Sequence, residues 1–550
     1  MLAQTAGATP EIAWSSFAPE LLVAGVALAL LLFTVARDNR IPATVIVGLL
    51  GLALGAWLLS QELWIPGGTV VGLSALATSM TIGFEGRHDL SNVWIAGLAA
   101  LGALLLTGWQ WVEVLDPQLQ AVSQGLSGGL ATQLQGSVAH DGIAFFTRIT
   151  VYVTVLLVLP VGYGYLRDRE IYRPEVEPLV LLAATGMALL GAAGDLIVVF
   201  IAVEMLSFAL YVLVGLARRD RRSQEAALKY FVTGAVASAL LVYGMALLYA
   251  ATGTVDIAAI GQALGLVTTP DRVAVLGVAL VIVGFAFKVA LVPFHLWTPD
   301  VYQGAPTSVT AFMSAATKAA GFAAVLRLFL LGFGRLEDVW VPALAVIAAL
   351  TMMIGAIAAV VQRDVKRILA YSSLAHAGYA AIGVAAGSAA GLSATLWYLL
   401  TYAVTTVASF GAVVAIERRR RGEVSLVDLK GLGRTSPALA ALFSLSLLSL
   451  AGIPPTAGFQ GKLAVFTAGV ESDLTWLVVI GVVSSVIAAF FYLRLMAMMF
   501  LEEAEEGAPE PVVSTGLSAG LAAASAAIVV LGVIPATFLT LAEQAAVLAR

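Results

Sequence analysis

The feature that most constrains this chain is a series of apolar runs, each about 20 residues long, that recurs from one end of the sequence to the other. Folded as a helix, a run of this length crosses the ~30 Å hydrocarbon layer of a membrane. Only 11% of the residues are charged and 60% are hydrophobic, whereas a soluble domain carries roughly 25% charged residues. The sequence therefore predicts an all-α integral membrane protein.

The apolar runs also give approximate positions for the spans. Segment 66–84, rich in Gly, Ser and Thr, is a borderline span, and the polar stretch 113–141 predicts a loop. The opening residues lack a basic region and a cleavage site, so the first run is expected to remain as a helix. The predicted spans are about 17–36, 41–60, 91–112, 142–165, 177–193, 195–216, 226–250, 272–297, 306–332, 338–361, 367–389, 391–416, 435–465, 473–500 and 515–541.

Basic residues predict the orientation, because Lys and Arg gather in cytoplasmic loops. The first basic loop follows the first span, so the N-terminus is expected to lie outside. The first two basic loops are both expected in the cytoplasm, so an even number of spans must lie between them. The chain then has sixteen spans if 66–84 crosses the membrane, and fourteen if one of the three neighbouring runs does not cross. The five basic loops hold Arg37 and Arg40; Arg167, Arg169 and Arg173; Arg218, Arg219, Arg221 and Arg222; Arg363, Lys366 and Arg367; and Arg418 to Arg421 with Lys430 and Arg434.

Two predicted spans are interrupted by proline, one at Pro293 and the other at Pro454 and Pro455. Proline removes a backbone donor and frees a carbonyl about one turn earlier. In lipid, such a gap is tolerated only where protein or water satisfies the backbone. A pair of interrupted helices is typical of inverted-repeat transporters, although a simple packing kink would leave the same pattern.

Few charges lie within the spans, and each would cost about 2.5–3.5 kcal/mol at a helix centre facing lipid. The candidates are Glu204, Lys288, Lys318 and Lys462, together with Lys229 near the end of its helix. Such residues usually mark an ion path. The alternatives are a structural ion pair or a lysine whose charged end reaches the membrane surface, and the second applies most to Lys229.

A lysine suits proton transfer, because burial lowers the pKa of an ammonium group and a nearby carboxylate raises it again. Glu204 and Lys288 are the natural switch pair, and Lys318 and Lys462 would then pass the proton onward. His295 and His376 could take part through their two ring nitrogens. His376 is equally compatible with a hydrogen bond that holds two helices together.

Other site chemistries find little support in the sequence. The chain has no Cys, which excludes disulfides and thiolate ligands, including those of iron–sulfur clusters. The four His residues lack ligand spacing, so no metal or haem site is expected. Neither a nucleotide-binding motif nor a nucleic-acid-binding signal is present.

One run is highly distinctive. Residues 291–330, LVPFHLWTPDVYQGAPTSVTAFMSAATKAAGFAAVLRLFL, closely resemble the subunit N family of the proton-pumping NADH–quinone oxidoreductases (respiratory complex I). The runs FIAVEMLSFALYVLVG, EAALKYFVTGAVASALLVYG, QRDVKRILAYSSLAHAGY and LSLAGIPPTAGFQGK extend the resemblance over about 142–500. The sister subunits L and M, and the multi-subunit sodium/proton antiporters, have a related but different sequence at the first break.

The resemblance implies fourteen core helices. It divides the chain into N-terminal helices with an inserted segment (1–141), an antiporter-like core (142–500) and a C-terminal helix (501–550). The core would hold two inverted five-helix repeats, at about 177–332 and 338–500. The resemblance also implies an ion pair between Glu204 and Lys288, a relay through Lys318 and Lys462, and functional roles for Lys229 and His295. Segment 61–141 departs from the family, which usually has a short connection there.

The function that follows is that of a pump subunit, which moves protons while electrons pass elsewhere in the complex. No cofactor is expected on this chain, and NADH, FMN, iron–sulfur clusters and quinone are expected on other subunits. The expected partners are membrane subunits of the J, K, M and L types and membrane lipid, in a bacterial plasma membrane. The alternatives are an Mrp-like cation/proton antiporter subunit and a structural membrane subunit with inert buried pairs.

Overall fold

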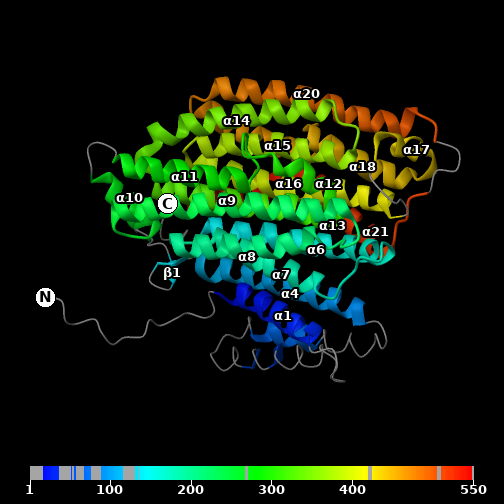
Figure 1. Cartoon of the computed structure of the whole chain (residues 1–550), viewed down its shortest axis with the longest axis horizontal. Coiled ribbons are helices and arrows are strands. Elements are labelled where there is room, and N and C mark those ends of the chain that lie inside the picture. Colours follow the sequence, from blue (N-terminus) through cyan, green and yellow to red (C-terminus); the bar gives the residue numbers. More distant parts are fainter. Residues whose placement is uncertain are drawn as a thin grey trace.

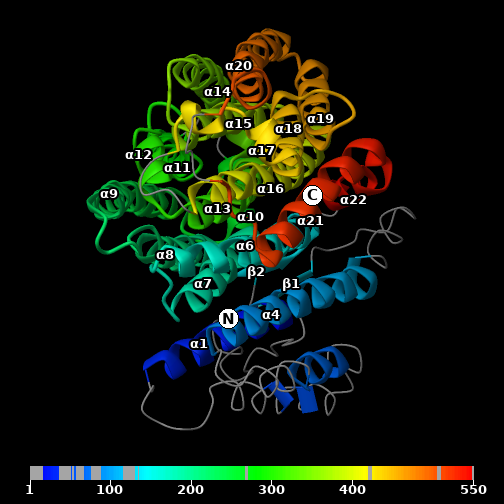
Figure 2. The same cartoon turned by 90° about the vertical axis from the view of Figure 1, so that its right-hand side faces the viewer.

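The structure is a computed structural model that describes residues 17–35, 51–52, 55–56, 67–75, 88–115, 131–133, 136–266, 271–418, 424–504 and 510–547. Most of these residues are helical, and the long helices lie side by side (Figure 1). Helices α1 (Ala18–Val35) and α4 (His88–Gln110) lie at one side of the bundle, and α14 (Glu337–Val360) and α20 (Thr475–Leu501) lie at the opposite side (Figures 1 and 2).

The remaining elements follow the chain in order. They are η2 (Trp111–Leu115), β1 (Ala131–Gln133), β2 (Val138–His140), α6 (Gly142–Asp168), α7 (Val176–Gly191), α8 (Leu196–Val214), α9 (Arg221–Thr252), α10 (Ile257–Gly265), α11 (Arg272–Lys288), α12 (Trp297–Gly304), α13 (Thr307–Arg327), η3 (Leu328–Gly332), η4 (Gly334–Leu336), α15 (Val365–Ala385), α16 (Ala389–Glu417), η5 (Leu426–Leu429), α17 (Leu432–Thr435), α18 (Pro437–Ala451), α19 (Ala457–Glu471), α21 (Thr515–Val533) and α22 (Pro535–Val547).

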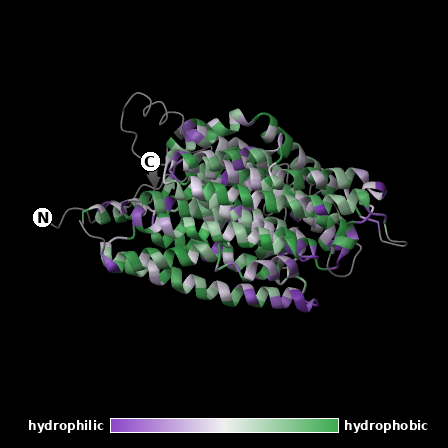
Figure 3. Ribbon diagram, turned by 90° about the horizontal axis from the view of Figure 1, so that it is seen from above, coloured by the Kyte–Doolittle hydropathy of each residue, from purple (hydrophilic) through white to green (hydrophobic). Residues whose placement is uncertain are grey.

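Ten helices within the described ranges are long and apolar enough to cross a membrane. Hydrophobic residues dominate the middle of the bundle, and many hydrophilic residues lie toward the helix ends (Figure 3). Each predicted span from 91–112 onward coincides with a helix or with a helix pair that meets at a break. Of the borderline span 66–84, only 67–75 is described, and it is helical. Most of 41–60 lies outside the described residues, so the choice between fourteen and sixteen spans stays a prediction.

The loop predicted over 113–141 is wrong at its start, where η2 continues to Leu115, and near its end, where two strands form. Strands β1 and β2 pair as an antiparallel hairpin, with Ala131 opposite His140. Strand β2 gains a second partner in the α7–α8 connection, where the Ala139 N–H donates to the Ala192 carbonyl at 2.7 Å. The local sequence predicts a loop because the pairing that makes these residues extended involves a segment distant in the chain.

The span predicted over 515–541 coincides with a membrane-length helix at its start, but its predicted end is wrong. Helix α21 ends at Val533 and α22 begins at Pro535. Pro535 has no N–H to donate to the preceding turn, and its ring restricts Ile534 to extended backbone. Ile534 is accordingly non-helical, with φ −122° and ψ 61°.

Two helices in different parts of the chain begin in the same way. Asp195 caps α8 and Asp364 caps α15, and each carboxylate accepts from a backbone N–H three residues on. Each aspartate also forms an isolated β-bridge, Asp195 with Asp256 and Asp364 with Ser425. The partner residue in each case caps the short helix that follows a long one, α10 after α9 and η5 after α16. The same local device therefore occurs once in each half of the core.

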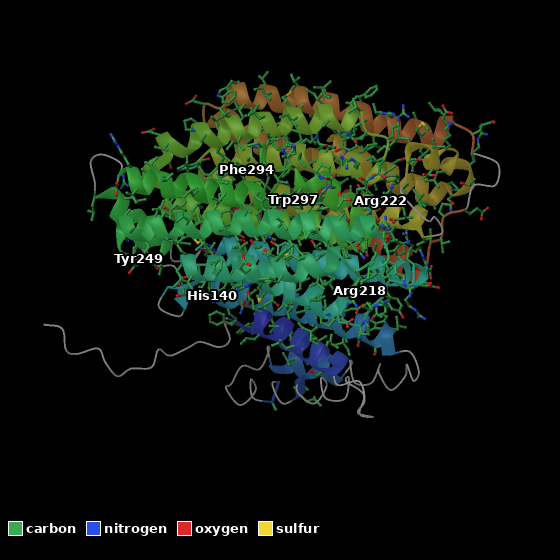
Figure 4. All side chains as sticks on the ribbon, in the orientation of Figure 1. His140, Arg218, Arg222, Tyr249, Phe294 and Trp297 are labelled. Carbon is green, nitrogen blue, oxygen red and sulfur yellow. The ribbon has the colours of Figure 1, made fainter. Side chains whose placement is uncertain are left out.

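Four of the predicted basic loops lie at one end of the helices. Residues in or next to these loops line a single cavity of about 50 Å³, to which Arg169, Arg222, Lys366 and Glu417 contribute from the ends of four helices. Figure 4 shows Arg218 and Arg222 at this end, and His140 and Tyr249 at the opposite end. The grouping agrees with the prediction that these loops share one side of the membrane.

A buried ion pair joins three helices at the opposite end of the bundle. The Arg327 guanidinium binds both carboxylate oxygens of Asp141 at 2.7 Å and also donates to the Gly191 carbonyl at 2.8 Å. The arginine and aspartate side chains are 2% and 0% exposed. The contact joins the end of α13 to the start of α6 and the end of α7.

Arg327→Met is expected to destabilise the chain by about 3–5 kcal/mol, because it leaves the Asp141 carboxylate buried without a partner. The thermal denaturation midpoint of the purified protein in detergent measures this loss. The double variant Arg327→Met/Asp141→Asn removes both charges and should recover part of the midpoint. A single variant as stable as the unmodified chain would contradict the role of the pair.

His140, in β2 and outside the spans, should make stability depend on pH. Burial, with the nearby cations of Arg148 and Arg327, lowers the pKa of His140 to about 3. The folded chain thus keeps this ring neutral, while an unfolded chain protonates it below its ordinary pKa of about 6.5. Stability contributed by His140 is complete above that pH and falls by about 1.4 kcal/mol per unit as the pH drops toward 3. Between pH 6.5 and 5, denaturation midpoints should fall less for His140→Gln than for the unmodified chain.

Candidate functional site: a buried polar series

The first helix break lies directly after Lys288, where α11 ends. Residues 289–296 are non-helical, Ala290 has a φ of 63°, and the Val292–Pro293 peptide is cis. The backbone groups that the break frees find side-chain partners. The Trp297 indole N–H donates to the Phe287 carbonyl at 3.1 Å, and the Val292 N–H donates to the Thr351 hydroxyl at 2.9 Å. The predicted interruption is confirmed, and Trp297 lies within the bundle beside it (Figure 4).

Lys288 is buried at this break. Its Nζ donates to Ser207 Oγ at 2.7 Å and lies 5.8 Å from the centre of the Tyr230 ring. The ammonium adjoins a narrow cavity with room for about one water molecule, which Ser207 and Ser238 also line. The lysine therefore contacts neutral oxygen and an aromatic face.

Glu204 lies on α8, one turn before Ser207. Its Oε1 accepts a hydrogen bond from Ser238 at 2.6 Å. Over the described residues, no Glu204–Lys288 contact is as short as an ion pair, although the two charges interact electrostatically. Ser207 and Ser238 both line the cavity beside Lys288, and Ser238 also binds Glu204. A functional pairing of Glu204 with Lys288, for example through one water molecule, stays a prediction.

Lys318 lies in the middle of α13 and is 3% exposed. Its Nζ donates to the Ser373 carbonyl of α15, and the ring centre of Tyr402 lies 5.6 Å away. The Tyr402 hydroxyl donates to Ser373 Oγ at 2.8 Å. Gly321, one turn later, faces the first break, where an added Cβ would meet Val289 and lie 4.0 Å from Lys288 Cγ. Helix α13 thus brings Lys318 next to the segment that holds Lys288.

His376, on α15, connects two tyrosines. Its Nδ1 lies 2.6 Å from the Tyr398 hydroxyl and its Nε2 lies 3.2 Å from the Tyr492 hydroxyl. The ring interacts electrostatically with both Lys462 and Lys318. This position suits both readings that the sequence left open, a proton relay and a helix-packing hydrogen bond.

The second break lies between α18 and α19, and it too is confirmed. Gly452 adopts a φ of 83°, and the Pro454–Pro455 peptide is cis. Here the freed carbonyl of Ala451 accepts from Lys462 Nζ at 2.9 Å, and Ser485 Oγ accepts from the same ammonium at 2.8 Å. Lys462 is 5% exposed, so it is as deeply buried as Lys288 and Lys318.

Two sequence candidates lie outside this series. The Lys229 side chain is 44% exposed and pairs with Glu225 at 2.6 Å and Asp300 at 2.9 Å. His295 is buried inside the first break, and its Nδ1 has no hydrogen-bond partner among the described residues. Their proposed roles stay predictions.

The hydroxyl groups that surround the lysines were not predicted from the sequence. Ser207, Ser373 and Ser485 each contact one ammonium, and Tyr398 and Tyr492 hold His376. A usable signal existed for two of them. Ser207 lies three residues after Glu204, and Ser373 lies three residues before His376, so each shares a helix face with a buried titratable group.

The comparisons with known proteins agree with this arrangement. Residues 193–488 match the family described as NADH:quinone oxidoreductase/Mrp antiporter, transmembrane. The chain is 41% identical to NADH-quinone oxidoreductase subunit N of Rhodococcus opacus, over 100% of this chain and 99% of that protein. It is 48% identical to the subunit N of Thermobifida fusca, over 81% of this chain and 82% of the relative. The chain belongs to the subunit N family of the NADH–quinone oxidoreductases.

Solved structures of this and related families are similar. A chain of respiratory complex I from Thermus thermophilus with bound aureothin has a TM-score of 0.70 and 34% identity, and the match covers 86% of this chain and 99% of that one. A chain of the Mrp complex from Dietzia sp. has a TM-score of 0.69 and 27% identity, with coverages of 83% and 95%. The Rhodococcus alignment runs through segment 61–141, so that subunit N relative shares sequence there.

Proposed function

We propose that this subunit N family member carries protons across the membrane, through the series from Glu204 and Lys288 to Lys318, His376 and Lys462. The observation that carries the proposal is the environment of the three lysines. Each is buried, and each donates to serine or backbone oxygen. A buried ammonium held by neutral oxygens is costly, which suits a group that must release its proton.

The surroundings supply the short steps that such transfer needs. Ser207 and a water-sized cavity adjoin Lys288, Ser373 adjoins Lys318, and tyrosine hydroxyls connect His376 to its neighbours. The chain would act within an NADH–quinone oxidoreductase, with membrane subunits of the J, K, M and L types as partners. NADH oxidation and quinone reduction, with FMN and iron–sulfur clusters, would belong to other subunits.

The architecture is proposed to comprise fourteen core spans with inverted repeats at about 177–332 and 338–500, within a core of 142–500. Two observations support the repeats. Each half contains one proline-interrupted helix, and the bridged caps of Asp195 and Asp364 lie at opposite ends of the bundle. The basic end would face the cytoplasm of a bacterial cell and the N-terminus would lie outside.

The Mrp-like alternative predicts a different ion. We expect the assembled oxidoreductase, reconstituted in liposomes, to pump protons at an unchanged proton-to-electron ratio when choline replaces all sodium. The reason is that the titrating groups of the series are lysine amines and an imidazole, which bind protons, whereas hard cations such as Na⁺ prefer oxygen ligands. A ratio that falls when sodium is removed, and recovers when it is restored, would favour a sodium/proton antiporter instead.

A further inference from the structure

A buried carboxylate lies at the basic end of the bundle, apart from the lysine series. Glu417 is the last residue of α16, and its side chain is 7% exposed. Its Oε1 accepts from the Arg169 guanidinium at 2.8 Å and from the Tyr165 hydroxyl at 3.1 Å. Its Oε2 accepts from the hydroxyl of Thr307, the first residue of α13.

Glu417 borders the cavity of about 50 Å³ at this end, and a buried lysine borders it too. Lys366 is 4% exposed, and its Nζ donates to the Ala305 carbonyl at 2.7 Å. The other charged groups that line the cavity are Arg169, Arg222, Asp220 and Asp364. The cavity therefore joins two buried acids, Glu417 and Asp364, and one buried lysine within a polar space that water can fill.

The wall of this cavity continues toward Lys318. Residues Gln303 to Pro306 form part of the lining, and Tyr302 directly precedes them. The Tyr302 side chain interacts with the Ser373 hydroxyl. Ser373 also supplies the carbonyl that binds the Lys318 ammonium. Tyr302, which is next in the chain to the cavity lining, thus contacts the same serine whose carbonyl binds Lys318.

We propose that Glu417, together with Lys366, takes up protons from the side of the membrane where the basic loops lie and supplies Lys318 through Tyr302 and Ser373. The inference rests on the proposed proton-translocating function. The Glu417 carboxylate accepts a proton from water in the cavity, and bulk solvent neutralises the hydroxide that remains. The proton then passes along the hydroxyl groups to the neutral amine of Lys318, which regenerates the carboxylate.

The test uses Glu417→Gln in the assembled oxidoreductase, reconstituted in liposomes. Glutamine keeps the volume and one acceptor oxygen but cannot carry the proton. We expect the rate of proton pumping to fall roughly tenfold or more, which is a modest loss for an acid–base group. Formate added on the uptake side should restore part of the rate, because a small acid can enter the cavity and replace the missing carboxyl.

The matched control is Asp168→Asn. Asp168 pairs with Arg418, the neighbour of Glu417, but its side chain is 45% exposed and does not line the cavity. This variant should pump at the unmodified rate. Pumping by Glu417→Gln at the unmodified rate would overturn the inference. A slow Glu417→Gln variant that formate does not restore would also overturn it, because Glu417 would then have only a structural role.

Lys318→Met separates this inference from the function on which it rests. If Lys318→Met pumps normally, the proposed proton path itself fails. If Lys318→Met is inactive while Glu417→Gln pumps normally, the path stands and only the uptake site is wrong.

Discussion

Replacing Lys288 with methionine should stop proton transfer through this subunit while the chain still folds and assembles. Methionine fills a similar volume, so packing at the first helix break is preserved. The variant loses the group that Ser207 and the Tyr230 ring surround, and the half-buried Glu204 carboxylate loses a nearby cation while it keeps its hydrogen bond from Ser238.

The measurement is the proton-to-electron ratio of the oxidoreductase during NADH-driven quinone reduction in liposomes. Losing a positioned proton-transfer group slows its step by about 10²-fold or more, so pumping coupled to this chain should fall sharply. Lys288→Arg should not restore it, because arginine does not release its proton. Lys430→Met is the matched control, since Lys430 lies near the surface, 3.5 Å from Glu502. If Lys288→Met pumped at the unmodified ratio, the inert-pair alternative would become the better one.

The helix breaks and the buried lysines of the site were predictable, because the membrane interior penalises two features that are visible in a sequence. A proline within an apolar run breaks the helix, and a charge within such a run must be shielded. Both rules are local, so Pro293, Pro454 and the buried lysines could be named from the residues alone. The structure confirms both breaks and buries Lys288, Lys318 and Lys462.

What the sequence could not supply depends on how the helices are turned toward one another. Lys288 was expected beside Glu204, yet its hydrogen bond goes to Ser207, one turn further along α8. A rotation of a few tens of degrees decides between these two partners, and hydrophobic period does not fix it when a helix is apolar on all sides. The β1–β2 hairpin was not predicted for a related reason, because its extended form depends on pairing with Ala192 and Gly194.

The placement of Lys229 shows the same limit. Its position in the sequence allowed either a path residue or a charge near the membrane surface. The structure pairs it with Asp300, which also binds Arg367 at 2.8 Å. These contacts join α9, α12 and α15 around an acid that lies three residues before the cavity lining begins at Gln303.

Replacing Lys318 with methionine is the second large effect expected. This lysine lies between the Lys288 segment and His376, and its ammonium contacts the Ser373 carbonyl and the Tyr402 ring. No carboxylate forms an ion pair with it among the described residues. Lys318→Met therefore leaves no unpaired charge behind, so the protein should lose little stability. Proton pumping should fall by about 10²-fold or more, since the series then lacks its central amine.

A second variant, His376→Gln, distinguishes a proton-relay role of the histidine from a helix-packing role. If the histidine relays protons between Lys318 and Lys462, His376→Gln should also slow pumping, even though glutamine can keep a hydrogen bond to Tyr398 or Tyr492. If the histidine only packs helices, His376→Gln should pump normally and show a lower denaturation midpoint. If Lys318→Met pumped at the unmodified ratio, the proposed series would be wrong at its centre, because Lys288 and Lys462 lie beside separate helix breaks with Lys318 and His376 between them.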